Sequence, residues 1–215
     1  MTRQAFTPRE YQHAIIEQAL DLPRCAIWAG MGMGKSVGAL TALDILEITE
    51  PGPALVLAPL RVAASTWPDE AAKWEHLTNV GVSAVVGTPE ERRAALKRPA
   101  TIYTTNYDNL PWLVEHFGDK WPFRKVVADE STKLKSFRLR QGGVRAQSLA
   151  RVAHCKVDRF IELTGTPSPN GLPMATTKSP TRKPSESASG KAVRLLLGIW
   201  ITATSLSESE PMTLA

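Results

Sequence analysis

The chain has 215 residues, of which 43% are hydrophobic, 22% are charged and 7% are aromatic. This length suffices for one well-filled domain but not for two large ones, and the composition is ordinary for a globular protein. No segment approaches the roughly 20 apolar residues of a membrane span, and the N-terminus lacks a secretion signal. The net charge of +5 permits a polyanionic partner without requiring one.

Helices and strands are predicted to alternate along the chain. The expected helices cover 9–20, 35 to about 48, and roughly 61–75, where Pro68 marks a bend or a restart. The expected strands cover 25–28, 54–58, 82–86, 101–104, 125–128 and 159–163. Uniformly apolar strands that alternate with helices predict an α/β fold, a mainly parallel sheet covered on both faces in three layers.

The composition changes near residue 173. Residues 173–191 are rich in Ser, Thr, Pro, Lys and Ala and have no strong periodicity. We therefore predict one domain over residues 1–172 and a low-complexity or aberrant tail over 173–215 that is disordered. Cys25 and Cys155 lie in apolar stretches without a CxxC pair, so we expect buried free thiols in a reducing cytoplasm.

A glycine-rich turn follows the first predicted strand. Residues 29–36 read AGMGMGKS, which has P-loop spacing except that Ala29 replaces the usual first glycine. Glycines let main-chain N–H groups surround phosphate oxygens, and the helix that follows directs its positive end at the same phosphates. The residues expected to bind the nucleotide here are Gly30, Met31, Gly32, Met33, Gly34, Lys35 and Ser36. Lys35 would reach the β- and γ-phosphates, and Ser36 would ligate Mg²⁺.

Two carboxylates follow the apolar strand over 125–128. Asp129 fits the acid that holds Mg²⁺, usually through water, and Glu130 fits the base that orients and deprotonates the attacking water. An Asp-Glu pair alone is more often a helix cap. About ninety residues after a P-loop in the same alternating pattern, the catalytic interpretation of Lys35, Asp129 and Glu130 is favoured.

Further segments carry recognisable patterns in a fixed order. They are 6–12 (FTPREYQ), 57–60 (LAPL) followed by Trp67 and Trp74, 102–107 (IYTTNY), 133–135 (KLK) and 163–170 (LTGTPSPN). Together with the P-loop and the acidic pair, they resemble superfamily 2 helicases, most closely the SWI/SNF-type DNA translocases and their phage-encoded relatives. The resemblance covers residues 6–172.

This resemblance implies the first RecA-like motor domain of a DNA-dependent ATPase, using ATP and Mg²⁺ in the cytoplasm of a bacterium or a phage-infected cell. Gln12 would read the adenine. Contacts to DNA, mainly to its phosphate backbone, and the coupling of nucleotide state to DNA grip would involve Pro59, Arg61, Thr104, Thr105, Asn106, Thr164, Gly165 and Thr166, with Lys133 and Lys135 as further candidates. Such contacts position the protein rather than read sequence.

The chain departs from the family pattern in two ways. Thr132 stands where the acidic motif usually has His or Asp, which puts the coupling of hydrolysis to movement in doubt. Nothing after Asn170 resembles the second motor domain, which supplies the arginine fingers that contribute roughly 10³–10⁵ in turnover. We therefore expect a truncated fragment that hydrolyses ATP weakly or not at all.

Several alternatives stay open. The chain could be another P-loop ATPase, such as a phage packaging motor, or a non-catalytic fragment that only binds nucleotide or DNA. Individual residues also have ordinary structural roles available. Pro59 could simply end a strand, and Gln12 could be an exposed helix residue. The hydroxyls of Thr104 and Thr105 could simply stabilise turns. For Trp67 and Trp74, seven residues apart, packing in the core is favoured.

Overall fold

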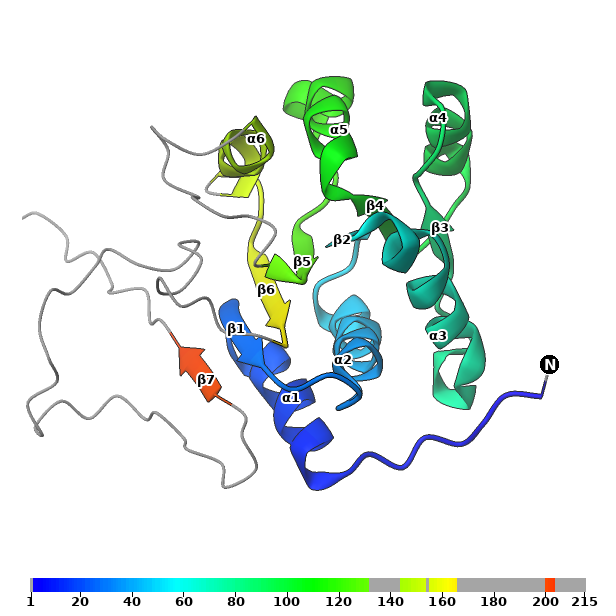
Figure 1. Cartoon of the computed structure of the whole chain (residues 1–215), viewed down its shortest axis with the longest axis vertical. Helices are drawn as coiled ribbons and strands as arrows, with labels where there is room; N and C mark the ends of the chain where they lie inside the picture. Colours follow the sequence, from blue (N-terminus) through cyan, green and yellow to red (C-terminus); the bar gives the residue numbers. More distant parts are fainter. Residues whose placement is uncertain (1, 132–143, 154, 166–199, 204–215) are drawn as a thin grey trace, which may run out of the picture.

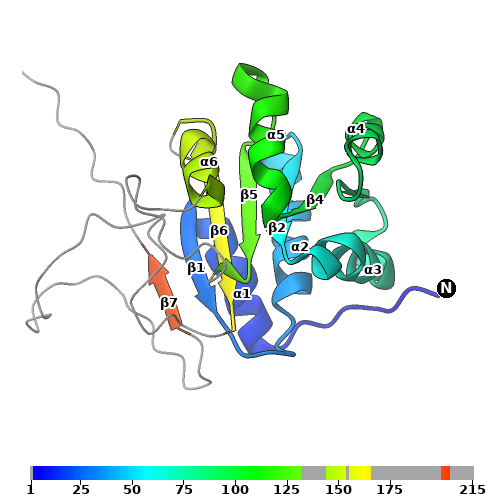
Figure 2. The same ribbon diagram turned by 45° about the horizontal axis from the view of Figure 1, so that its top comes forward.

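A central sheet of parallel strands organises the domain in the computed structural model, which describes residues 2–131, 144–153, 155–165 and 200–203 (Figure 1). The strand order is β3-β4-β2-β5-β6-β1-β7. Neighbours pair in parallel except β7, which pairs antiparallel with β1 (Figure 2). The strands are β1 (Arg24–Trp28), β2 (Ala54–Ala58), β3 (Val82–Ala84), β4 (Ile102–Asn106), β5 (Lys125–Asp129), β6 (Arg159–Thr164) and β7 (Trp200–Ala203).

Helices cover both faces of this sheet, so the predicted three-layer α/β fold is confirmed (Figure 1). The α-helices are α1 (Glu10–Asp21), α2 (Lys35–Thr49), α3 (Trp67–Lys73), α4 (Pro89–Lys97), α5 (Leu110–Phe117) and α6 (Val144–Ala153). Short 3₁₀ turns lie at Glu75–Leu77, Tyr107–Asn109 and Gly118–Lys120. One apolar core joins the sheet to α1, α2 and α3, and a second joins it to α5 and α6. No helix among the described residues is long and apolar enough to cross a membrane.

The predicted helix over 61–75 is in fact two elements. A π-helical turn at Val62–Thr66 precedes α3, and the amide N–H of Trp67 reaches back to the carbonyl of Val62. Pro68 has no N–H to donate and its ring would crowd the preceding turn, so the wider turn lies where the sequence predicted a bend.

The outcome for the cysteines and the tail is mixed. Cys25 is a buried free thiol as expected, but the prediction for Cys155 was wrong because that free thiol is exposed in the turn after α6. Most of the predicted tail lies outside the described residues, and four residues of it form β7.

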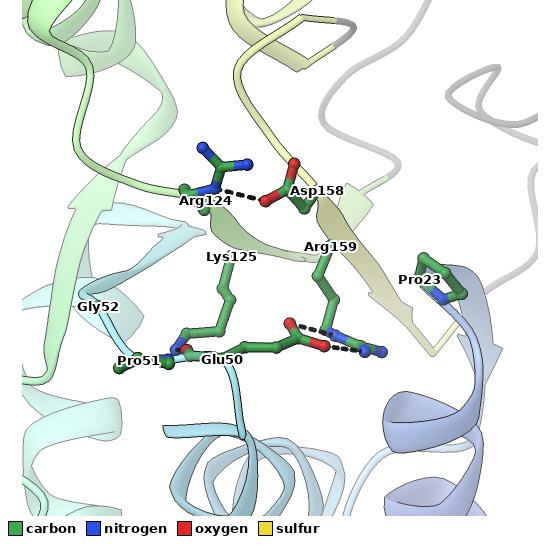
Figure 3. A pocket seen from close by; sticks show the side chains of 8 residues that line it. All are labelled: Pro23, Glu50, Pro51, Gly52, Arg124, Lys125, Asp158 and Arg159. Carbon is green, nitrogen blue, oxygen red and sulfur yellow. Dashed lines mark hydrogen bonds and ion pairs between the residues drawn. The ribbon is translucent and has the colours of Figure 1, made fainter. Parts of the chain in front are cut away.

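Two buried cations close the amino edge of the sheet, where β5 and β6 begin (Figure 3). Nη1 of Arg159 donates to the carbonyls of the last turn of α1 and the residue after it, Ala19, Leu20 and Leu22, at 2.8–3.0 Å, and the guanidinium pairs with Glu50. Lys125 donates to Glu47 at 2.9 Å and to the main-chain carbonyl of Glu50. The cations therefore satisfy carbonyl groups that the ends of α1 and α2 leave unpaired.

A buried acid lies in the middle of β6. Glu162 is 2% exposed and pairs in register with Ala128 and Ala26 of the neighbouring strands. Its Oε2 has no hydrogen-bond partner among the described residues. Burial raises the pKa of Glu162 to about 8, and the neighbouring Ser131 hydroxyl opposes that rise only in part.

Replacing Arg159 should lower the free energy of unfolding far more than replacing Arg124, which lies at the same edge of the sheet. Arg159→Met leaves the Glu50 carboxylate and three carbonyls without their donor, so we expect the free energy of unfolding to fall by about 3–5 kcal/mol. Arg124→Met removes an ion pair with Asp158 whose side chains are 69% and 56% exposed, so less than about 1 kcal/mol should be lost. Urea denaturation measures both. Equal losses in the two variants would contradict the capping role.

Glu162 should make the domain less stable as the pH rises. Between its ordinary pKa of 4.5 and its folded pKa of about 8, the unfolded chain loses the proton while the folded chain keeps it. The folded state then binds more protons, so the free energy of unfolding falls with rising pH, by up to a few kcal/mol over this window. Urea denaturation from pH 5 to 8 should show a shallower decline for Glu162→Gln than for the wild type. Parallel curves would contradict a buried neutral acid.

Candidate nucleotide site

The P-loop lies at the carboxyl edge of the sheet, between the end of β1 and the start of α2. Gly34 is the N-cap of α2 and has φ +69°, and Gly32 has φ +78°, a backbone conformation that side chains with a Cβ rarely adopt. The amide of Ala29 donates to the carbonyl of Thr164 at 3.2 Å, which ties the loop to the end of β6. The loop thus lies between the end of a parallel strand and the N-terminus of α2, whose positive end is attractive to anions.

Lys35 lies inside the curve of this loop. Its Nζ donates to the carbonyls of Ala29 and Gly30 at 2.7 and 2.9 Å. Burial lowers the pKa of Lys35, and the charges of Asp129 and Glu130 act in the opposite direction. The fold therefore brings both predicted carboxylates close enough to the P-loop lysine to interact with it. Ser36 follows in the first turn of α2.

Gln12 lies directly against the P-loop. A Cβ added to Gly34 would lie only 2.3 Å from Nε2 of Gln12, so a side chain there would displace the Gln12 amide. Oε1 of Gln12 accepts the amide N–H of Arg9 at 2.9 Å, which fixes the side chain. The close contact of α1 with α2 also depends on Gly38, where an added Cβ would lie 2.8 Å from Cγ2 of Ile15.

Asp129 ends β5 and is held from both helical layers. It is 7% exposed, and its Oδ2 accepts the indole N–H of Trp67 at 3.0 Å. Its main-chain carbonyl accepts the Tyr107 hydroxyl at 2.7 Å. Burial raises the pKa of Asp129, and the Trp67 hydrogen bond is the strongest opposing influence. The protein thus stabilises a carboxylate in a place where burial alone would favour the neutral acid.

Glu130 turns out of the sheet into solvent. Its φ is +54°, and it is the one non-glycine residue with positive φ among the residues that the structure describes. This left-handed conformation costs a residue with a Cβ on the order of 1 kcal/mol. The strained turn separates the two neighbouring carboxylates, so that Asp129 is buried and Glu130 is exposed.

The end of β6 reaches the P-loop from the other side. A Cβ added to Gly165 would lie 3.7 Å from the Ala29 carbonyl oxygen and 3.9 Å from Nζ of Lys35. Thr164 and Gly165 therefore adjoin the loop and its lysine. Thr166 lies outside the described residues, as do Lys133 and Lys135.

The residues predicted to face DNA are divided between surface and interior. Arg61 is exposed and Pro59 is partly exposed where β2 ends. Thr104 and Thr105 are fully buried, and their hydroxyls donate to the carbonyls of Ala63 at 2.6 Å and Val85 at 2.7 Å. Asn106 is 8% exposed, and its Oδ1 has no partner among the described residues. The geometry of the two threonines matches the alternative interpretation, in which their hydroxyls stabilise turns.

Sequence reasoning missed the roles of Trp67 and Tyr107 at Asp129. The prediction that Trp67 packs in the core is correct, since it is fully buried. Trp74 is partly buried, packs against the same core and donates to Glu70 at 2.8 Å. A signal for the contact did exist, because a buried indole N–H nearly always finds an acceptor. The sequence alone does not tell which acceptor it finds.

Comparison with known proteins assigns this arrangement to a family. The model of the SNF2-related domain family matches residues 22–176. Protein p41 of Acyrthosiphon pisum secondary endosymbiont phage 1 is 59% identical over 170 residues, covering 78% of this chain and 37% of that protein. The ATP-dependent DNA helicase DDM1 of Arabidopsis thaliana is 29% identical over 152 residues, covering 66% of this chain and 18% of the helicase. The chain thus spans well under half the length of these relatives.

A solved structure shares the fold. The SWI2/SNF2 ATPase core of Sulfolobus solfataricus, determined in complex with double-stranded DNA, has a TM-score of 0.57 and 20% identity, covering 75% of this chain and 32% of that one. The UvsW helicase of bacteriophage T4 has a TM-score of 0.54 and 12% identity, covering 76% of this chain and 55% of that one. The chain belongs to the SNF2-related domain family, and its fold is that of the N-terminal RecA-like domain of SNF2-type helicases.

Proposed function

We propose that the chain binds MgATP at the carboxyl edge of its sheet and serves as the ATP-binding half of a DNA-dependent ATPase. The observation that carries this proposal is the convergence of Lys35, Asp129 and Glu130. Lys35 begins α2 after the P-loop and the two acids stand at the end of β5, and their charges interact beside the P-loop. Gln12 and Gly165 flank the same loop.

Each residue of this group has a chemical task in the proposal. Lys35 and the amides of residues 30–36 bind the phosphates, and Gln12 recognises the adenine. Ser36 and Asp129 would hold Mg²⁺, Asp129 through water, and the ion when bound would neutralise charge on the phosphates. A hydroxyl and a single carboxylate suit Mg²⁺, which keeps several waters and takes its other ligands from phosphate. Glu130, which is exposed and whose charge acts on Lys35, would accept a proton from water.

DNA is the proposed partner, by analogy with the relatives. The helicase name of one relative and the DNA in one neighbouring structure support this choice. Among the predicted contacts, Arg61 is exposed and charged, and we assign it the main phosphate contact in the described part of the chain. The hydroxyls of Thr104 and Thr105 would have to give up their internal hydrogen bonds to reach DNA, so we assign them to support of this surface.

A second RecA-like domain completes the site in the proposal. Lys35, Asp129 and Glu130 supply phosphate binding and the base, and the arginine finger would come from that domain. A phosphate-release assay with and without DNA separates an active ATPase from a domain that only binds nucleotide. Contact of Gln12 with the bound nucleotide, seen in a crosslinking footprint, would favour the helicase-like reading over a packaging motor.

Loss of the P-loop lysine should abolish tight MgATP binding. We expect Lys35→Ala to weaken the affinity by about 100-fold or more, because several charge-assisted hydrogen bonds to phosphate are lost together. Isothermal titration calorimetry with a non-hydrolysable ATP analogue measures this. Lys97→Ala, which changes an exposed lysine at the end of α4, is the matched control and should bind normally. Normal affinity in Lys35→Ala would sink the proposal.

Arg61 should contribute to the salt dependence of DNA binding. Each phosphate contact adds about 0.9 to the slope of log affinity against log salt concentration for duplex DNA. We expect Arg61→Ala to reduce this slope by about 0.9, measured by fluorescence anisotropy of a labelled duplex. Arg93→Ala, at an exposed arginine of α4 paired with Glu90, should leave the slope unchanged. Identical slopes in all three proteins would remove Arg61 from the DNA contact.

A further inference from the structure

Two buried aromatic side chains hold Asp129 from opposite faces of the sheet. Trp67 belongs to the core beneath α1, α2 and α3, and its Nε1 donates to Oδ2 of the carboxylate. Tyr107 belongs to the core beneath α5 and α6, and its hydroxyl donates to the main-chain carbonyl of the same residue. One contact fixes the carboxylate and the other fixes the backbone that carries it.

The placement of both donors is itself rigid. Trp67 is fully buried and begins α3 directly after the π-helical turn. The carbonyl of Ala63 within that turn accepts the Thr104 hydroxyl of β4, and β4 ends one residue before Tyr107. Three hydrogen bonds, together with the short chain segments between their residues, therefore link the turn after β2 and the start of α3 to the end of β4 and the end of β5.

We propose that Trp67 and Tyr107 are positioning residues that fix the orientation in which Asp129 meets Mg²⁺. The inference rests on the proposed function, because it assigns them a role toward the ion of that site. Neither residue is assigned contact with the nucleotide. They affect how much Mg²⁺ contributes to nucleotide affinity. A carboxylate that lacks its hydrogen-bond donor rotates or binds a different partner, and so is no longer oriented toward the ion.

The test compares nucleotide affinity in Mg²⁺ with affinity in EDTA. The ratio of the two dissociation constants for a non-hydrolysable ATP analogue reports the ion's contribution and cancels contacts made to the nucleotide alone. Trp67→Phe keeps a buried aromatic ring and removes the N–H donor. A hydrogen bond to a charged group is worth about a tenfold change, so we expect this variant to lose about tenfold in the ratio. Tyr107→Phe, which loses a bond to a neutral carbonyl, should lose about threefold.

Matched controls separate positioning from packing. Trp74→Phe removes an indole N–H that donates to Glu70, and Tyr103→Phe removes a hydroxyl that donates to the carbonyl of Arg98. Both controls should keep the wild-type ratio. Thermal unfolding identifies any variant that does not fold, and if Trp67→Phe fails to fold, Tyr107→Phe decides the question.

The outcomes distinguish this inference from the proposed function. A wild-type chain whose nucleotide affinity does not depend on Mg²⁺ overturns both. A wild-type chain with Mg²⁺-dependent affinity, together with unchanged ratios in the folded Trp67 and Tyr107 variants, overturns this inference alone. Equal losses in the variants and in their controls would also overturn it, because they would show a general effect of aromatic substitution.

Discussion

Burial of the Asp129 carboxylate at the end of β5 is the constraint around which the carboxyl edge is built. β5 lies between β2 and β6 in the sheet, and its last residue, Asp129, is 7% exposed. A buried carboxylate is costly unless donors surround it. The Trp67 indole donates to this carboxylate and the lysine of the P-loop adds an opposite charge, while the Tyr107 phenol, from the other core, donates to the main-chain carbonyl of the same residue. The site and the two cores are therefore parts of one packing arrangement.

At the amino edge of the sheet the buried charged groups are positive, and they too need hydrogen-bond partners. There the buried groups are the cations Lys125 and Arg159, and their partners are carbonyls and carboxylates from the ends of α1 and α2 (Figure 3). The cavity lined by these residues has its charges already paired. The amino edge thus stabilises the ends of the helices, while at the carboxyl edge Lys35, Asp129 and Glu130 lie close enough for their charges to interact.

The sequence predicts the strands well because their burial on both faces requires uninterrupted apolar runs. The strand over 54–58 has the predicted bounds, and the other five predicted strands differ by at most two residues at either end, whereas β7 was not predicted. The P-loop, the acidic pair and the adjoining β6 segment are likewise local patterns. The order of the strands and the contacts of Arg159, Glu162 and Trp67 are not local. A charged residue in a strand, or an indole N–H in a core, has an ordinary surface or packing interpretation until tertiary structure supplies its partner.

The left-handed backbone of Glu130 bears on how this position can change over generations. Substitutions there by residues with a Cβ keep the steric cost of this conformation, whereas glycine adopts it without that cost. Drift governed by stability alone would therefore lead the position toward glycine. The glutamate therefore lowers the stability of the fold relative to glycine, so its side chain is not there for the stability of the domain.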